Sequence, residues 1–251
     1  MQRRPRLLII NPNTSETVSA SIDALARHTL GDDAEIRTVT APFGLSYLFT
    51  RVAVSIAAHA ALDAAAREAE GGYAADAVVV GCFGDPGREA LAEMLGVPVV
   101  GFAEAGLVHA ASLPGRSIVA VHGSIWCEML SELVLRLGIS HKITGIVSIE
   151  GHDEVASSLA DYVTRQALVH GAERVIVGGA GLIGIIPDVA AAAGVPVVDP
   201  HRIAILQAQH LAQARLRAAP SQPGGSARGL SPALARLAGA PVEIPSLSSA
   251  S

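Results

Sequence analysis

The sequence contains two stretches that follow one pattern. Residues 76–87 read DAVVVGCFGDPG, and residues 173–184 read ERVIVGGAGLIG. Each starts with a charged residue, continues into a short apolar run typical of a buried strand, and then places glycines at three matching positions. The tips differ, because Cys82 in the first stretch stands where Gly179 stands in the second. Any chemistry that the two turns share is therefore asymmetric.

The match between the two halves extends beyond these turns. Residues 117–124 (SIVAVHGS) correspond to residues 7–14 (LLIINPNT), and residues 193–199 (AGVPVVD) correspond to residues 95–101 (LGVPVVG). Short β-rich runs alternate with alanine-rich helical stretches, which predicts an α/β fold of two pseudo-symmetric lobes, each a four-stranded parallel sheet flanked by helices. In the first half we expect strands at 7–11, 35–40, 76–81 and 97–101, and helices at 15–30, 52–70 and 88–95.

The repeat also predicts the domain organisation and the position of a site. We expect a first lobe at 1–104, joined by a returning helix within 200–217, and a second lobe at 105–199. Residues 218–251 are rich in Pro, Ser, Gly and Ala, with one weak helical pattern at 231–238, and predict a flexible tail. Ligands of open parallel sheets bind outside the carboxyl ends of the strands. Two facing lobes should therefore place Cys82 and Gly179 across one cleft, with Asn13 and His122 at its floor.

Composition narrows the possible partners and the compartment. The chain has 251 residues, 50% of them hydrophobic, and a net charge of -5 with scattered Lys and Arg, so we expect no nucleic-acid partner. No apolar run approaches the roughly 20 residues of a membrane helix, so we expect no membrane partner. Residues 7–10 form too short an apolar run for a signal peptide, and two cysteines favour a reducing, cytoplasmic setting. Uncovered sheet edges often pair, so a homo-oligomer is possible.

Four motifs in this order resemble the aspartate/glutamate racemase superfamily, and most of all its hydantoin racemase branch. They are residues 10–15 (INPNTS), 82–87 (CFGDPG), 100–105 (VGFAEA) and the turn at 178–181, and the resemblance runs from about 7 to 215. It implies a cofactor-independent enzyme, without a metal, that acts on a small molecule at a carbon next to a carboxylate or amide carbonyl. Racemases of this superfamily use two cysteines, one from each lobe, to exchange a proton on opposite faces.

Cys82 fits the first of these two roles. A thiol has an unperturbed pKa close enough to neutral to act as acid or base, and we expect a helix N-terminus to lower the pKa of Cys82 further. The nearby glycines would let backbone amides approach a bound anion, and Asn13 and Thr14 could add side-chain donors. The alternative for Cys82 is an inert buried thiol. Cys127, within an apolar helix, is interpreted as a packed and unreactive thiol.

The sequence departs from the racemase pattern at two positions of the expected site. Gly179 offers no acid or base, although a cysteine there should fit sterically because the matching turn holds one between the same glycines. His122 follows Val121 where hydantoin racemases usually carry a pair of threonines, and a histidine is a capable proton carrier near neutral pH. His122 is therefore either a catalytic or a structural residue. We expect the substrate to contact Asn13, Thr14, Ser46, Phe83, Gly84, Gly179 and Ala180.

Aromatic residues concentrate after the predicted strands, which bears on the substrate. Six of the eight aromatic residues do so, and they would either line the cleft mouth or plug the interface between the lobes: Phe43, Tyr47, Phe49, Phe83, Phe102 and Trp126. If they line the cleft, the substrate carries an apolar or aryl group.

Three functions remain open from the sequence. The first, which we favour, is a racemase or epimerase of a hydantoin-like or amino-acid-like compound, with Cys82 on one face and His122 or water on the other. The second is a decarboxylase like the arylmalonate decarboxylases, which also keep one cysteine, although theirs lies in the second lobe. The third is a non-catalytic binder of small molecules.

Overall fold

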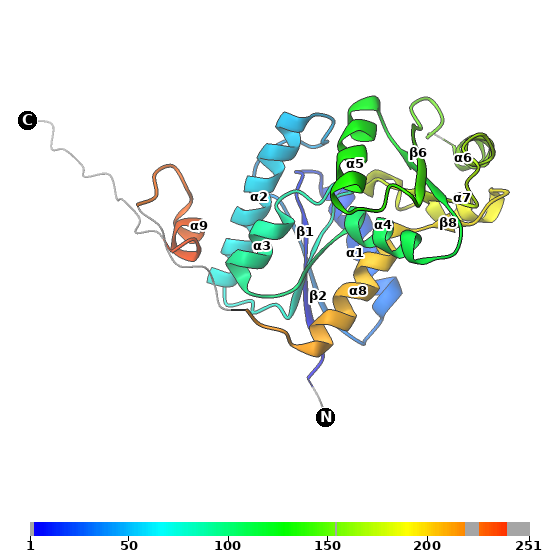
Figure 1. The fold of residues 1–251 in the computed structure, drawn as a ribbon. Coiled ribbons are helices and arrows are strands. Elements are labelled where there is room, and N and C mark those ends of the chain that lie inside the picture. Colours follow the sequence, from blue (N-terminus) through cyan, green and yellow to red (C-terminus); the bar gives the residue numbers. More distant parts are fainter. Residues whose placement is uncertain (1–2, 154, 219–225, 240–251) are drawn as a thin grey trace, which may run out of the picture.

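The computed structural model describes residues 3–153, 155–218 and 226–239, and its chain forms two α/β lobes (Figure 1). Each lobe holds a four-stranded, all-parallel sheet, with strand orders β2-β1-β3-β4 and β6-β5-β7-β8, so the two lobes repeat one topology and the predicted fold is confirmed. The first sheet comprises β1 (Arg6–Asn11), β2 (Glu35–Thr40), β3 (Ala77–Val80) and β4 (Val99–Gly101). The second comprises β5 (Ser117–Val121), β6 (Ile143–Ser148), β7 (Arg174–Val177) and β8 (Val197–Val198).

Helices connect the strands and cover the sheets. Several begin at side-chain caps that the sequence supplies: Ser15 accepts a hydrogen bond from the Val18 amide, and Thr50 accepts one from the Ala53 amide. The helices of the first half are α1 (Glu16–Leu30), α2 (Arg51–Glu70), α3 (Arg88–Leu95) and α4 (Phe102–Ser112). The second half contains α5 (Ser124–Arg136), α6 (Ala156–Val169), the 3-10 turn η1 (Ala180–Leu182), α7 (Ile186–Ala192) and α8 (Pro200–Ala214).

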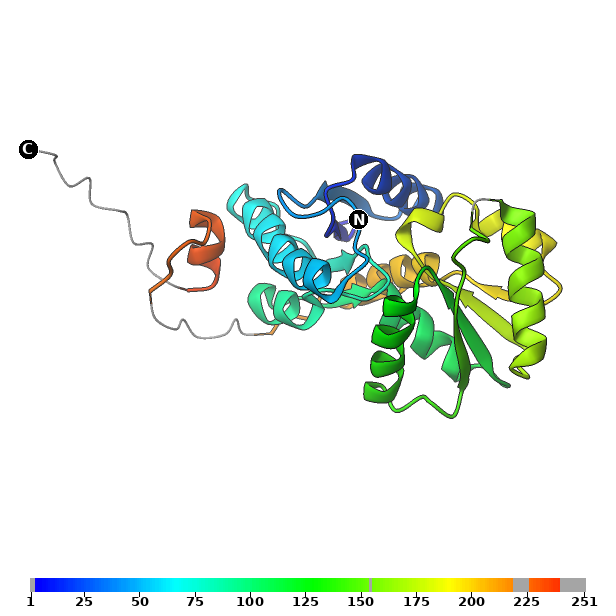
Figure 2. The same ribbon diagram turned by 90° about the horizontal axis from the view of Figure 1, so that it is seen from above.

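Helix α8 returns the chain from the second lobe to the first. It starts after β8 and packs against α4, α1 and the first-lobe strands β1, β3 and β4, as its orange ribbon shows in Figure 2. One buried apolar cluster contains Ile9 of β1, Val119 of β5 and Ile205 of α8. The two sheets therefore share a continuous core, which holds the strand ends of both lobes close together.

The segment after α8 contains one further helix. Helix α9 (Pro232–Leu237) packs through Ala233 and Leu234 against Ala66 of α2, and Arg236 pairs with Glu70. A packed helix thus lies inside the stretch that the composition predicts to be a flexible tail, while residues 219–225 and 240–251 fall outside the described residues. The division into domains stays a prediction. No helix in the described ranges is long and apolar enough to cross a membrane.

Candidate active site

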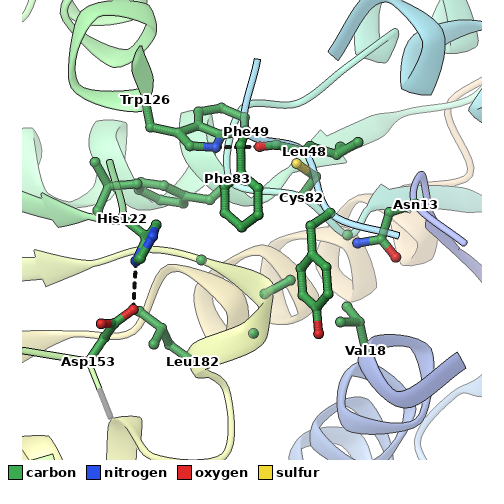
Figure 3. Close-up of a pocket in the computed structure, with 17 residues that line it drawn as sticks. Asn13, Val18, Leu48, Phe49, Cys82, Phe83, His122, Trp126, Asp153 and Leu182 are labelled. Carbon is green, nitrogen blue, oxygen red and sulfur yellow. Dashed lines mark hydrogen bonds and ion pairs between the residues drawn. The ribbon is translucent and has the colours of Figure 1, made fainter. Parts of the chain in front are cut away.

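A cavity of about 310 Å³ lies between the lobes at the carboxyl ends of the strands (Figure 3). We call it the interlobe cavity. The first lobe contributes residues that follow β1, β2 and β3, and the second lobe contributes residues that follow β5, β6 and β7. Cys82 and Gly179 both line it, together with Asn13 and His122, which is the arrangement that the repeat predicts.

Cys82 sits in a tight turn directly after β3. Its amide donates to the carbonyl of Val80 at 2.9 Å, and its own carbonyl accepts from the amides of Gly84 and Asp85 at 3.0 and 3.2 Å. A Cβ at Gly81 would come within 2.7 Å of Cδ1 of Ile22 and 3.2 Å of the Ile10 carbonyl, so glycine gives the closest fit as the chain leaves β3. Because the amides of Gly81 and Gly84 already bind carbonyls within the protein, they are not the anion-binding donors that the sequence suggests.

The environment of Cys82 favours the neutral thiol. Its residue exposure is 8%, and burial raises the pKa of the thiol well above its usual value, with the nearby Asp85 carboxyl adding to the effect. The expected lowering of this pKa by a helix terminus is wrong, because α3 begins only at Arg88, beyond the whole turn. Cys82 is therefore a protonated thiol rather than a thiolate in the free protein.

Asp85 fastens the Cys82 turn to α4. Its carboxyl accepts hydrogen bonds from the amides of Ala103 and Glu104, at 2.9 and 2.7 Å, in the first turn of that helix. Burial raises the pKa of Asp85 to about 7, although both amides and the neighbouring Arg88 favour the ionised form. Asp85 also adopts a positive φ of 53°, which is uncommon for a residue with a side chain, although aspartate tolerates it better than most. Its role is thus to shape the turn.

Asn13 presents a donor to the interlobe cavity. Its Oδ1 accepts hydrogen bonds from Nδ2 of Asn11 at 2.8 Å and from the amide of Ser15 at 2.9 Å, which fixes the orientation of the side-chain amide. Nδ2 of Asn13 then faces the cavity (Figure 3), and it has no hydrogen-bond partner among the described residues. A substrate carbonyl is the kind of acceptor that this group fits.

His122 faces the cavity from the second lobe and is paired with a carboxylate. Its Nδ1 lies 2.6 Å from Oδ2 of Asp153, in the loop between β6 and α6 (Figure 3). Phe49 packs against the imidazole with ring centroids 5.6 Å apart. Sequence reasoning missed Asp153. The available signal was its place after β6, which is the neighbour of β5, the strand directly before His122.

The second-lobe turn is shaped by a side chain of the first lobe. Phe83 lies so close to Gly178 that a Cβ there would come within 2.1 Å of its ring. Gly179 has a φ of +138°, a conformation that residues with a side chain rarely adopt. The amides of Gly179 and Ala180 have no hydrogen-bond partner within the described ranges, and both residues line the cavity. This turn therefore lines the cavity with two amides that no described carbonyl satisfies, at the position of the second thiol in the superfamily that the sequence resembles.

A loop from the first lobe covers the interlobe cavity. Residues 41–50, which we call the covering loop, bring Tyr47, Leu48 and Phe49 to the cavity between β2 and α2. The indole nitrogen of Trp126, on α5 of the second lobe, donates a hydrogen bond of 2.6 Å to the carbonyl of Leu48. Nearby, Arg51 pairs with Glu132 at 2.7 Å. The covering loop is thus attached to both lobes.

The predicted binding residues separate into two groups. Asn13, Phe83, Gly179 and Ala180 line the interlobe cavity along with Cys82 and His122. The other three do not line it: the amide of Thr14 donates to Leu45, Ser46 is exposed, and Gly84 packs under the ring of Trp126 beside a second cavity.

The predicted aromatic cluster is correct in part. Four of its members line the interlobe cavity, namely Tyr47, Phe49, Phe83 and Trp126. Phe102 is instead fully buried against His201, and Phe43 packs on His59.

The charge of the cavity is low. Among the described residues that line it there is no lysine or arginine, and Asp153 is the one acidic side chain. Neutral N–H donors without a cation suit the carbonyl of a neutral amide better than a substrate with two carboxylates.

Comparison with known proteins agrees with this architecture. Residues 7–208 match the family described as Asp/Glu/Hydantoin racemase. A hydantoin racemase of Paenarthrobacter aurescens is 29% identical over 216 residues, which cover 82% of this chain and 90% of that protein. An allantoin racemase structure from Klebsiella pneumoniae has a TM-score of 0.78 at 24% identity, covering 86% of this chain and 90% of that chain. An arylmalonate decarboxylase structure has a TM-score of 0.56 at 19% identity, covering 90% and 96%.

Proposed function

Because the chain belongs to the Asp/Glu/Hydantoin racemase family and is an enzyme of the racemase type, we propose that it inverts a carbon next to an amide carbonyl in a neutral, hydantoin-like ring. The observation that carries this proposal is that Cys82 and His122, from opposite lobes, line the same cavity. No lysine or arginine is among the described residues that line it. In Figure 3 the two side chains lie apart from one another, and both line the interlobe cavity.

The proposed reaction exchanges one proton across the substrate. Nε2 of His122 removes the proton from the α-carbon, and the electron pair of that bond moves into the carbonyl to form an enolate. The Cys82 thiol then delivers its proton to the opposite face, which leaves a thiolate and an imidazolium. The same steps in reverse convert the other enantiomer and restore both groups. Because burial raises the pKa of Cys82, its thiol holds the proton that it delivers in the first direction.

The enolate oxygen needs donors that do not reorganise during the reaction. Nδ2 of Asn13 is held in place by the two hydrogen bonds to its own oxygen, and the amides of Gly179 and Ala180 are fixed in the second-lobe turn. Tyr47, Phe49, Phe83 and Trp126 lie among aliphatic residues and glycines, so the rest of the wall is apolar and partly aromatic. The proposed substrate therefore carries an apolar or aryl substituent on the reacting carbon.

The test uses optically pure 5-benzylhydantoin in heavy water. We expect loss of the circular dichroism signal together with α-deuterium incorporation by NMR, at rates well above a buffer blank. Cys82→Ser should slow both by at least about 10²-fold, as should His122→Gln. Cys127→Ser is the matched control, since this half-exposed thiol lies outside the cavity lining. Racemisation that survives Cys82→Ser would contradict the proposal.

A decarboxylase is the second candidate, and one observation favours it. Cys82 is the single described thiol in the cavity and rests protonated, which is sufficient for an enzyme that only protonates an enediolate after carbon dioxide leaves. Phenylmalonate in the same heavy-water assay separates the two functions. Release of carbon dioxide from phenylmalonate, without racemisation of hydantoins, would support the decarboxylase function and contradict the racemase function.

A further inference from the structure

We propose that Asp153 is a positioning residue of the reaction, which holds the proton of His122 on Nδ1 so that the lone pair of Nε2 faces the substrate. This inference rests on the proposed role of His122 and adds a residue from a different loop. The distance between Nδ1 of His122 and Oδ2 of Asp153 is 2.6 Å, short for a hydrogen bond between a ring nitrogen and a carboxylate. An ionised carboxylate can only accept, so the ring nitrogen that it contacts must carry the proton.

The pair is enclosed more than a surface ion pair would be. The side chain of Asp153 is 20% exposed and that of His122 is 40% exposed. Phe49 of the covering loop packs against the imidazole ring. The aspartate at one edge and the phenylalanine against the ring together fix both the tautomer and the tilt of His122.

The backbone that leads to Asp153 is hydrogen-bonded to the residues on either side of His122. The amide of Ile149 donates to the carbonyl of Val121 at 3.0 Å, and the amide of Gly123 donates to Oγ of Ser148 at 3.1 Å. These bonds bracket His122 on both sides. The start of the Asp153 loop and the strand end at His122 are therefore one hydrogen-bonded unit.

A second contact anchors the same loop from α6. The hydroxyl of Tyr162 donates to the carbonyl of Ser148 at 2.8 Å, and its ring stacks on His152 with centroids 4.2 Å apart. His152 is the residue immediately before Asp153. The carboxylate is thus presented by a braced segment, which is what a positioning role requires.

The consequence for catalysis follows from the two ring nitrogens. With the proton on Nδ1, Nε2 is an acceptor and can take a proton from carbon. Without the carboxylate, the proton can reside on Nε2 instead, and the group that faces the substrate becomes a donor that cannot act as the base. The effect should appear mainly in kcat, since the substrate itself does not contact the carboxylate in this scheme.

The experiment compares Asp153→Ala, Asp153→Glu and the control Asp161→Ala. Asp161 is an exposed residue of α6, so its removal takes away the same charge without touching the cavity lining. We expect Asp153→Ala to lower kcat for 5-benzylhydantoin by about 10- to 100-fold with little change in KM. Asp153→Glu should recover part of the loss, and Asp161→Ala should behave as wild type. Unchanged kcat in Asp153→Ala would overturn the inference.

A second readout does not depend on turnover. Nitrogen-15 NMR of His122 distinguishes the two tautomers, and we expect Nδ1 protonated in the wild type and this preference lost in Asp153→Ala. A wild-type ring that carries its proton on Nε2 would overturn the inference even if the enzyme is active. If no hydantoin racemises but the tautomer changes as expected, the proposed function fails while the positioning of His122 by Asp153 stands.

Discussion

Replacing Gly179 by cysteine tests the asymmetry of the site, because it installs the thiol that the second-lobe turn lacks. The space for it exists: a Cβ at Gly179 would lie 3.5 Å from Cδ1 and 3.6 Å from Cγ of Leu182, which is ordinary contact. The backbone is the obstacle, since φ is +138° and ψ is 120°. The sequence-based expectation of an easy fit assumed matching backbones, and this is wrong, because Cys82 is not among the residues with positive φ.

Gly179→Cys has two opposing effects, because backbone strain lowers stability while the added thiol raises the rate of proton transfer. Holding a residue with a side chain in this region costs on the order of 1–3 kcal/mol, so Gly179→Cys should lower the free energy of unfolding by that amount. A positioned acid or base contributes about 10²–10⁴-fold to the rate of proton transfer. The catalytic gain therefore outweighs the loss of stability, provided that the variant stays folded.

The assay is designed so that strain and chemistry are measured apart. Gly179→Ala carries the same backbone strain without a thiol, and the two variants should unfold in urea at similar concentrations. Both are also made in a His122→Gln background, where the proposed second base is absent. We expect Gly179→Cys to raise racemisation of 5-benzylhydantoin at least about 10²-fold over Gly179→Ala in that background.

One result would refute this reasoning. If the folded double variant that combines Gly179→Cys with His122→Gln is no faster than the one that combines Gly179→Ala with His122→Gln, the second-lobe turn does not face the reacting carbon. The position of Gly179 in the cavity would then have no catalytic meaning.

Three further predictions concern stability, the covering loop and the thiols. Asp85 has a folded pKa of about 7, above the ordinary 3.8, so its contribution to stability is fully present below pH 3.8 and is lost as the pH rises through 7. Relative to Asp85→Asn, the wild type should lose about 1 kcal/mol of unfolding free energy between roughly pH 6 and 8 in urea titrations, and identical pH profiles would contradict the raised pKa. Trp126→Phe leaves the Leu48 carbonyl without its donor, so the free energy of unfolding should fall by about 1–3 kcal/mol and KM should rise. If neither quantity changes, the indole does not hold the covering loop in place. Burial raises the pKa of both thiols, but Cys127 is the more exposed, so iodoacetamide should label Cys127 before Cys82 in the free protein by mass spectrometry, the reverse of the sequence-based expectation. Earlier labelling of Cys82 would mean that its thiol is activated in spite of its burial.

The large-scale architecture was predictable because the sequence specifies it twice. The apolar runs and glycine turns at 76–87 and 173–184 indicate equivalent strands, and the structure places β3 and β7 at equivalent positions in the two sheets. The carboxyl ends of parallel strands then meet at one edge by geometry alone. That is why Cys82, Asn13 and His122 could be assigned to one cavity before their distances were known.

The chemistry of the site was less predictable, because it depends on distances between loops. Asp153 lies in an irregular loop with no periodic pattern, and it matters only because β6 pairs with β5. The ionisation of Cys82 depends on the length of its turn and on the buried Asp85, neither of which a motif reveals. Thr14 and Ser46 carry suitable donor groups but lie outside the cavity lining, since the amide of Thr14 bonds to Leu45 of the covering loop and Ser46 is exposed.

The close approach of Phe83 to Gly178 couples the two turns of the site. A side chain at 178 would overlap the Phe83 ring, so a larger residue there is acceptable only if residue 83 shrinks at the same time. The two turns that the sequence repeat makes equivalent thus constrain one another across the interlobe cavity, so we expect residues 83 and 178 to covary among relatives.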